Sequence, residues 1–183
     1  NGKTTVTQLT TAILKQCFSV STTLGNYNND IGLPLSILRS SEENCQRCVY
    51  ELGASKKNDI SYLVNICEPK MTALLNVSEA HMETFGSFET LINTKEEIFS
   101  HTNTDQVVLN KDDERFARWK KINKHKKVTT ISIFGDADYF IEKTDDEFFY
   151  ISTPKGKFEL IKKNSSEILA INLLFSIALA MEA

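Results

Sequence analysis

The sequence lacks three features that would place it in a special class of protein: a long apolar run, an excess of positive charge and a framework of cysteines. The longest apolar stretch, residues 168–181, is interrupted by Asn172 and Ser176 and is shorter than the roughly 20 residues that span a bilayer. We therefore expect a buried helix and no membrane insertion. The formal net charge of −3 gives no general attraction to nucleic acid, so any phosphate-bearing ligand must be held by a local site.

Two small clusters have unremarkable interpretations. The only basic run, residues 120–127, is interpreted as the solvated end of a helix rather than a nucleic-acid patch. Cys45 and Cys48 form a CxxC pair, but no second CxxC or CxxH completes a tetrahedral zinc site. We expect reduced thiols in the cytoplasm, and a redox-active CxxC pair is the alternative.

The composition and the order of apolar segments indicate one α/β domain. At 183 residues, 41% hydrophobic and 25% charged, the chain can bury a continuous core. Short, nearly continuous apolar strands alternate with helices, which predicts a mostly parallel sheet flanked by helices on both faces. The predicted strands are 48–52, 71–77, 106–110 and 128–134, and the predicted helices include 59–67, 88–100 and 166–183. Residues 138–161 predict an antiparallel hairpin or meander that turns at residues 153–156.

A phosphate-binding motif lies at the start of the chain. Gly2, Lys3 and Thr4 supply the last three residues of GxxxxGK[ST], and apolar residues at helical spacing follow them. A phosphate at a helix N-terminus is stabilised by free N–H groups and by the helix dipole. Taken alone, the motif is weak, because an exposed lysine at the start of a helix is the ordinary alternative.

Six short motifs occur in one order along the chain and together resemble the Mur ligase family. They are NGKTT at 1–5, GNYNNDIGLPL at 25–35, ELGA at 51–54, NVSEAHMETFGS at 76–87, TKEEIF at 94–99 and LNKDD at 109–113. The resemblance covers essentially the whole chain and identifies it with the central, ATP-binding domain of these enzymes. It implies a fold like that of P-loop NTPases, with residues 1–183 beginning inside the P-loop. The UDP-binding amino-terminal domain and the carboxy-terminal domain of the family would lie outside them.

The resemblance also implies an activity. The segments 25–35 and 76–87 are most similar to the family member that adds D-alanyl-D-alanine to UDP-N-acetylmuramoyl-tripeptide. The implied reaction is ATP-dependent amide bond formation through an acyl phosphate, in peptidoglycan biosynthesis, by a cytoplasmic monomer. The isolated domain is expected to be inactive. Two alternatives stay open: another amide ligase of the superfamily, such as folylpolyglutamate synthase, and a nucleotide-binding module that does not catalyse.

The family's cofactors, ATP and two Mg²⁺ ions, imply roles for particular residues. Lys3 would contact the β- and γ-phosphates, Thr4 and Glu51 would bind the first Mg²⁺, and His81 would bind the second. The nucleotide-binding residues are expected to be Asn1, Gly2, Lys3, Thr4, Thr5 and Asn172. The expected catalytic residues are Lys3, His81 and Lys95.

Lys95 would be carbamylated by CO₂, as in the family, and the carbamate would help to hold the second metal. Its neighbours in the sequence are apolar, and a partly buried lysine tends to lose its charge, as carbamylation requires. The alternative is a lysine that extends from an apolar helix face to solvent.

Several further residues have two interpretations each. Asn28 and Asn29 would shape a loop near the substrate, although asparagine also forms turns. Glu79 is either a third acidic residue of the site or simply a loop residue close to it. Asp112 and Asp113 are interpreted as a helix N-cap. Asn172 matches the family's adenine-contacting asparagine, whereas Ile168 and Leu169 stand where the family usually has a His-Asn pair.

Overall fold

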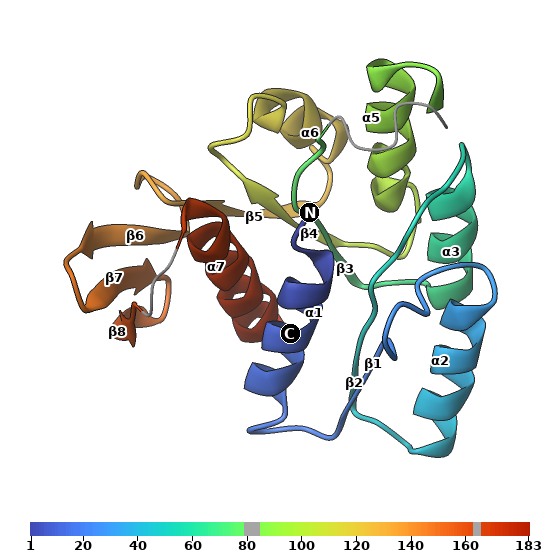
Figure 1. Ribbon diagram of the computed structural model, residues 1–183, viewed down its shortest axis with the longest axis horizontal. Helices are drawn as coiled ribbons and strands as arrows, with labels where there is room; N and C mark the ends of the chain where they lie inside the picture. The colour runs from blue at the N-terminus through green and yellow to red at the C-terminus, as the bar shows by residue number, and fades with distance from the viewer. Residues whose placement is uncertain (79–84, 163–165) are drawn as a thin grey trace.

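The structure, a computed structural model, describes residues 1–78, 85–162 and 166–183 (Figure 1). Its helices are α1 (Lys3–Leu14), α2 (Gly32–Glu42), α3 (Asp59–Cys67), α5 (Phe88–Glu96), the 3₁₀ turn η1 (Glu97–Phe99), α6 (Phe116–Ile122) and α7 (Glu167–Glu182). Its strands are β1 (Val20–Thr22), β2 (Arg47–Val49), β3 (Met71–Leu74), β4 (Gln106–Asn110), β5 (Lys127–Ser132), β6 (Tyr139–Thr144), β7 (Phe148–Thr153) and β8 (Gly156–Ile161).

The strands form two sheets within the described residues. The larger has six strands in the order β3-β4-β5-β6-β7-β8, and β1 and β2 form a separate parallel pair. Strands β3 to β6 run parallel, whereas β7 and β8 continue the sheet antiparallel. The predicted α/β class, the mostly parallel sheet and the carboxy-terminal antiparallel meander are therefore confirmed.

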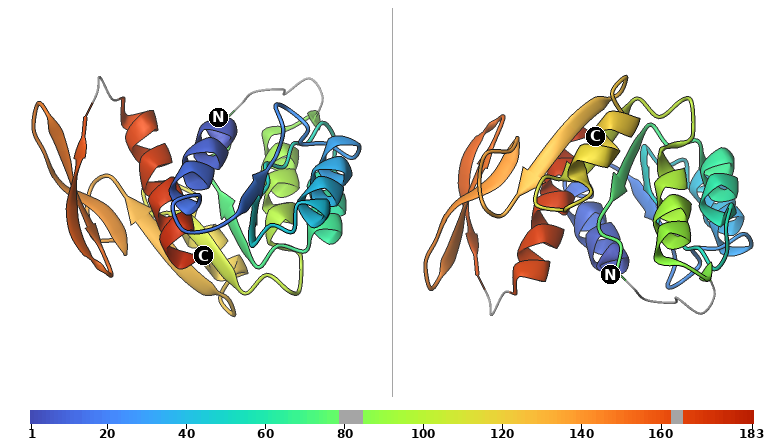
Figure 2. Two further views of the ribbon diagram at one scale, coloured as in Figure 1. Left: turned by 90° about the horizontal axis from the view of Figure 1, so that it is seen from below. Right: turned by 90° about the horizontal axis from the view of Figure 1, so that it is seen from above.

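Helices cover both faces of the parallel strands (Figure 2), and alternate residues of β4 point to the two faces. Val108 belongs to one core cluster, with residues of α1 and α7. Val107 and Leu109 belong to the other cluster, with residues of α5 and α6. Because both faces are buried, the strand appears in the sequence as an unbroken apolar run.

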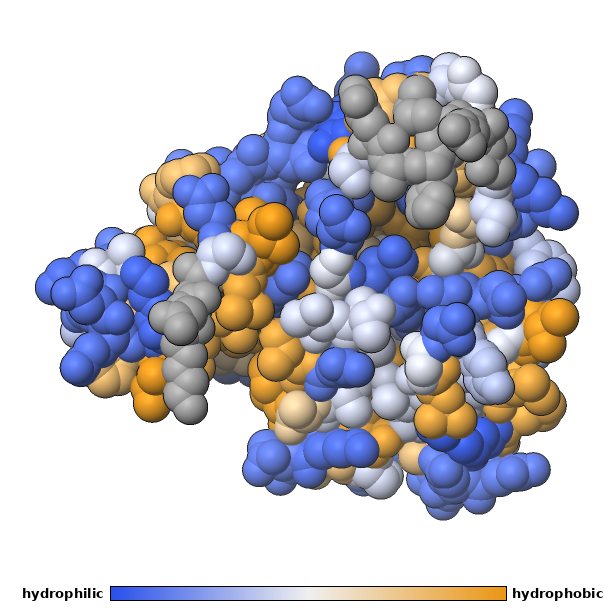
Figure 3. All heavy atoms as spheres, viewed as in Figure 1, coloured by the Kyte–Doolittle hydropathy of each residue, from blue (hydrophilic) through white to orange (hydrophobic). Residues whose placement is uncertain are grey.

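Helix α7 is the buried helix expected from the apolar stretch near the carboxy terminus. Leu174 and Phe175 are fully buried, and the Ser166 side chain caps the helix by accepting a hydrogen bond from Leu169 N. In the part of the chain that the structure describes, no helix is long and apolar enough to cross a membrane. Figure 3 shows apolar surface in separate patches, one of them over α2, where Ile31 and Leu35 are exposed.

The sequence analysis missed or misplaced several elements. Strand β1 and helix α2 were not predicted, and β2 and β3 are shorter than the apolar runs that predicted them. Helix α6 was expected only through its supposed cap and its basic end, without bounds. The interpretation of Asp112 and Asp113 as a helix N-cap is wrong, because Arg115 is the N-cap of α6 and has no side-chain cap. Asp112 instead accepts hydrogen bonds from Ser132 Oγ and Ile133 N, and Asp113 forms an ion pair with Arg115.

The structure places the cysteines and the basic run. All four cysteines lie within the described residues and are free thiols. Lys120 and Lys121 are exposed in the last turn of α6. The first part of the basic run is thus the solvated end of a short helix, as expected, whereas Lys126 lies in the turn that follows and donates to the carbonyl of Phe99.

Candidate functional site

The first turn of α1 has the geometry of a phosphate-binding helix start. Gly2 precedes the helix with a φ of 88°, in the left-handed region that glycine adopts without strain. A Cβ at this position would lie 2.4 Å from Oδ1 of Asn172, a buried residue of α7. Glycine is therefore required at position 2 for two reasons: the backbone conformation and the close approach of α7.

Glu51 lies at the centre of a hydrogen-bond network just beyond the end of β2. The Thr4 hydroxyl donates to its Oε2 over 2.7 Å, and Asn28 Nδ2 donates to its Oε1 over 2.8 Å. Its backbone N–H donates to Thr23 Oγ1. The Glu51 side chain is 7% exposed, and a carboxylate at that burial needs such donors. Three segments that are distant in sequence therefore meet at one carboxylate.

The Asn-rich loop between β1 and α2 gives its two central asparagines different roles. The backbone carbonyl of Asn28 accepts a hydrogen bond from Gly53 N, and its amide points to Glu51. Asn29 Oδ1 instead accepts from the backbone N–H groups of Ile31 and Gly32, where α2 begins. Asn28 is thus a member of the site, whereas Asn29 forms the turn that precedes α2, the structural alternative considered from the sequence.

Lys95 extends from α5 toward the start of α1. Its Nζ lies 5.8 Å from the centre of the Phe85 ring, and it lines a cavity of about 140 Å³ together with Lys3 and Asn76. Burial, and secondly the charge of Lys3, lower the pKa of the Lys95 ammonium group. The expectation of a partly buried lysine is confirmed. This environment favours the neutral amine more than water does.

Helix α5 is held by residues on either side of Lys95. Glu96 accepts hydrogen bonds from Trp119 Nε1 and Arg118 Nη2 of α6. Glu97 accepts from the backbone N–H groups of Asn58 and Ser61 at the start of α3. These contacts fix the carboxy-terminal end of α5 between two other helices, and they set the direction in which Lys95 extends.

The remaining predicted residues fall into two groups. Asn1 and Asn76 exchange two hydrogen bonds beside the start of α1, and Thr5 lies in its first turn. Asn172 lies against Gly2, next to the predicted phosphate site. His81 and Glu79 lie outside the described residues. Among the described residues, no group of three His, Cys, Asp or Glu side chains is placed to hold a metal ion.

Sequence reasoning missed two residues that hold the backbone near the site, Thr23 and Arg115. Thr23, whose hydroxyl accepts from Glu51 N, follows a three-residue strand that was not predicted. Arg115 pairs with Asp113 through two nitrogens and donates to the carbonyl of Val77, just after β3. The Asp-x-Arg spacing was the only indication in the sequence of these Arg115 contacts, and a charged pair at that spacing is common on protein surfaces.

The geometry defines the class of the protein: an α/β domain built like the P-loop nucleotide-binding domains, with a glycine-led helix start beside a strand-end carboxylate. Comparison with known proteins gives the family. The sequence profile of the Mur ligase middle domain matches residues 1–180. The chain therefore belongs to the Mur ligase middle domain family, and the resemblance seen in the sequence is confirmed.

Individual relatives point to one branch of that family. The UDP-N-acetylmuramoyl-tripeptide–D-alanyl-D-alanine ligase of Haemophilus influenzae is 32% identical, over 99% of this chain and 41% of its own length. The crystal structure of MurF from Acinetobacter baumannii superposes with a TM-score of 0.89 at 27% identity, over 100% of this chain and 41% of that one. MurF from Thermotoga maritima, solved in complex with ADP, gives a TM-score of 0.86 at 28% identity, over 100% and 43%. The chain thus spans about two fifths of the length of these relatives.

Proposed function

We propose that this chain is the ATP-binding middle domain of a ligase that joins D-alanyl-D-alanine to UDP-N-acetylmuramoyl-tripeptide. The observation that carries the proposal is the contact of Thr4 and Asn28 with Glu51, which brings three of the family-like motifs to one carboxylate. The named relatives support the choice of substrates. The tripeptide and the dipeptide would be held largely by parts of the parent protein outside residues 1–183. A monomeric state and a cytoplasmic location stay predictions.

The start of α1 supplies the binding groups for the polyphosphate of ATP. Its free backbone N–H groups and helix dipole favour an anion at this end of the helix. Lys3 is exposed at this end of the helix and would contact the β- and γ-phosphates. Asn172 lies against Gly2, and the family resemblance assigns it a contact with the adenine ring.

The oxygens of Thr4 and Glu51 fit a Mg²⁺ ion. They are 2.7 Å apart, and two neighbouring ligands of an octahedral Mg²⁺ with bonds of about 2.1 Å lie about 3.0 Å apart. Both oxygens could therefore serve as adjacent ligands with a shift of a few tenths of an ångström. When bound, Mg²⁺ neutralises the charge that develops on the transferred phosphoryl group. Asn28 would keep the Glu51 carboxylate oriented toward the ion.

Lys95 fits the role of a carbamylated lysine. Its partly buried amine, with a lowered pKa, is suited to react with CO₂, and the resulting anion would lie near the cationic Lys3. We propose that this carbamate and His81 hold a second Mg²⁺, as the family resemblance implies. The anionic group would replace a repulsion between two lysines with an attraction, which favours the modified state.

MgATP binding tests the phosphate site directly. In the full-length parent, we expect Lys3→Ala to weaken MgATP binding at least about tenfold by calorimetry, since it removes a charge from the phosphates. Lys15→Ala is the matched control, because Lys15 is exposed at the opposite end of the same helix. Equal affinity in the two variants would rule out the phosphate site.

A further inference from the structure

Helices α5 and α6 are joined by one row of polar contacts. Glu89, Asn93 and Glu96 of α5 follow one another at spacings of four and three residues, which places them on one face of the helix. Arg118 of α6 contacts all three. Its Nη1 donates to Glu89 over 2.7 Å, and its Nη2 donates to Asn93 over 2.6 Å and to Glu96 over 2.7 Å. One planar guanidinium group therefore holds a whole face of α5.

Glu96 is the buried end of this row. Its side chain is 10% exposed, whereas that of Glu89 is 61% exposed. Trp119 Nε1 donates to Glu96 Oε1 over 2.8 Å, and Arg118 donates to Oε2. Trp119 is itself fully buried. A buried carboxylate with a donor on each oxygen is held in one place, whereas an exposed ion pair such as that of Glu89 contributes little.

Lys95 directly precedes Glu96, in the last turn of α5. The α-helix ends at Glu96, and the 3₁₀ turn η1 begins at Glu97, so the regular backbone hydrogen bonding that would fix this turn stops there. Successive residues of an α-helix differ in direction by about 100° around the axis. A fixed Glu96 therefore also fixes the direction of Lys95, toward Phe85 and the cavity that it shares with Lys3.

We propose that Glu96, Arg118 and Trp119 are positioning residues for Lys95: the two side chains of α6 hold Glu96, and Glu96 holds the last turn of α5 so that the Lys95 amine stays in the cavity beside Lys3. The inference rests on the proposed function, in which Lys95 is the carbamylated lysine. It adds to that function the residues that place the amine. Arg118 and Trp119 lie outside the six family-like motifs of the sequence.

The size of the effect follows from helix geometry. Cα atoms lie about 2.3 Å from the axis of an α-helix, and an extended lysine side chain places Nζ about 6 Å further out. A rotation of the last turn of α5 by about 7° therefore moves the Lys95 Nζ atom by about 1 Å. A displacement of that size in a catalytic group lowers a rate by up to about 100-fold. A small movement of Glu96 is thus sufficient to disturb the amine.

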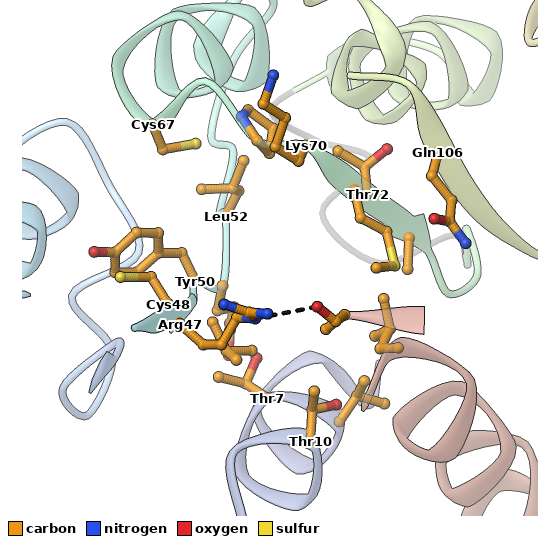
Figure 4. Close-up of a pocket in the computed structure, with 18 of the residues that line it drawn as sticks. Thr7, Thr10, Arg47, Cys48, Tyr50, Leu52, Cys67, Lys70, Thr72 and Gln106 are labelled. Carbon is orange, nitrogen blue, oxygen red and sulfur yellow. Dashed lines mark hydrogen bonds between the residues drawn. The ribbon is translucent and has the colours of Figure 1, made fainter. Parts of the chain in front are cut away.

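Labelling of a cysteine at position 95 tests the positioning without relying on turnover. The full-length parent carries Lys95→Cys, retains Cys67 and has its other cysteines replaced by serine. Cys67 lies in α3, on the wall of the separate cavity between β2 and β3 (Figure 4), so its reaction with iodoacetamide reports opening of the domain as a whole. We expect Glu96→Ala to raise the labelling rate at position 95, relative to that of Cys67, at least about fivefold.

Three further variants, made in the same background, separate positioning from a general loss of stability. Glu96→Gln keeps an oxygen that accepts from Trp119 Nε1, so the labelling ratio should stay within about twofold of its original value. Trp119→Phe keeps a buried ring but loses the donor, and its ratio should fall between those of the Gln and Ala variants. Glu89→Ala removes an exposed carboxylate from the same arginine, nearly two turns from Lys95, and should leave the ratio unchanged.

An unchanged ratio in Glu96→Ala, including an equal rise at position 95 and at Cys67, would overturn the inference. Turnover of the parent with Lys95 retained is the second readout. Glu96→Ala should lower kcat at least about tenfold and change the KM for MgATP by less than about twofold, because Lys3, Thr4 and Glu51 keep their places. A raised labelling ratio with an unchanged kcat would support the positioning and contradict the role of Lys95 in the proposed function.

Discussion

The contact between Asn28 and Glu51 allows a prediction of defined size. Asn28→Ala removes the donor 2.8 Å from Glu51 Oε1 and leaves Thr4 as the side chain that donates to this carboxylate. A hydrogen bond to a charged group is worth about 1.5–3 kcal/mol when it is buried. Asn28 is itself only partly buried, so water will replace part of the interaction. We expect a loss of about 1–2 kcal/mol in the free energy of unfolding.

A charged replacement at the same position gives a pH-dependent effect of known sign. Asn28→Asp places a second carboxyl group beside Glu51, and two carboxylates at this distance repel each other. The introduced carboxyl group then keeps its proton to a higher pH in the folded state than in the unfolded state. The variant should lose more stability than Asn28→Ala at pH 7, and it should recover part of the loss as the pH falls toward 5.

Urea unfolding of the domain measures both effects, with fluorescence from Trp119 as the probe. Trp119 is the only tryptophan and is fully buried. With a urea dependence of about 2 kcal/mol/M, the Ala variant should unfold about 0.5–1 M earlier. Asn29→Ala is the control for loss of the contact with Glu51, because the Asn29 side chain hydrogen-bonds only to the start of α2 among the described contacts. Equal pH dependence of the Asp and Ala variants would refute the reasoning.

Three further predictions follow from the site and the core. Gly2→Ala should destabilise the domain by about 2 kcal/mol more than Gly25→Ala in urea unfolding; both glycines have positive φ, but only at Gly2 would a Cβ meet another side chain within 4 Å. Equal losses would contradict the clash with Asn172. Burial raises the pKa of Glu182, but hydrogen bonds from Lys127, Gln106 and Tyr139 outweigh it and hold that pKa below its ordinary value. Its contribution to stability is therefore present above the unfolded-state pKa of about 4.3 and is lost as the pH falls through the folded-state value. Glu182→Gln should thus flatten the acid limb of a stability–pH curve, and an unchanged limb would exclude the effect. Lys95→Ala in the full-length parent should lower turnover at least about 100-fold, and a short carboxylic acid should partly restore it; unchanged turnover would remove Lys95 from the mechanism.

The sequence was most informative where one local rule decided the outcome. The strand 106–110 was predicted with its observed bounds because both of its faces are buried and its residues are continuously apolar. Helix α3 was likewise predicted with its observed bounds, from apolar residues on one helical face. The motif around Gly2 predicted a helix start, since a glycine-led turn before periodic apolar residues has few other structures available.

Prediction failed where contacts distant in sequence decide the structure. Helix α2 begins inside the segment that was interpreted as a loop, because Pro34 in its first turn is compatible with a helix. Strand β1 has three residues, too few to show a pattern. The different roles of Asn28 and Asn29 depend on where Glu51 lies, 23 residues beyond Asn28, and no local rule separates two adjacent asparagines.

The central claim is tested most directly by ATP-dependent phosphate release from the full-length parent protein. Two substrate pairs are supplied separately: UDP-N-acetylmuramoyl-tripeptide with D-alanyl-D-alanine, and a folate with glutamate. The account predicts phosphate release with the first pair alone. Release with the folate pair would assign the protein to another branch of the superfamily, and no release with either pair would indicate a nucleotide-binding module without catalysis; both results contradict the proposed function.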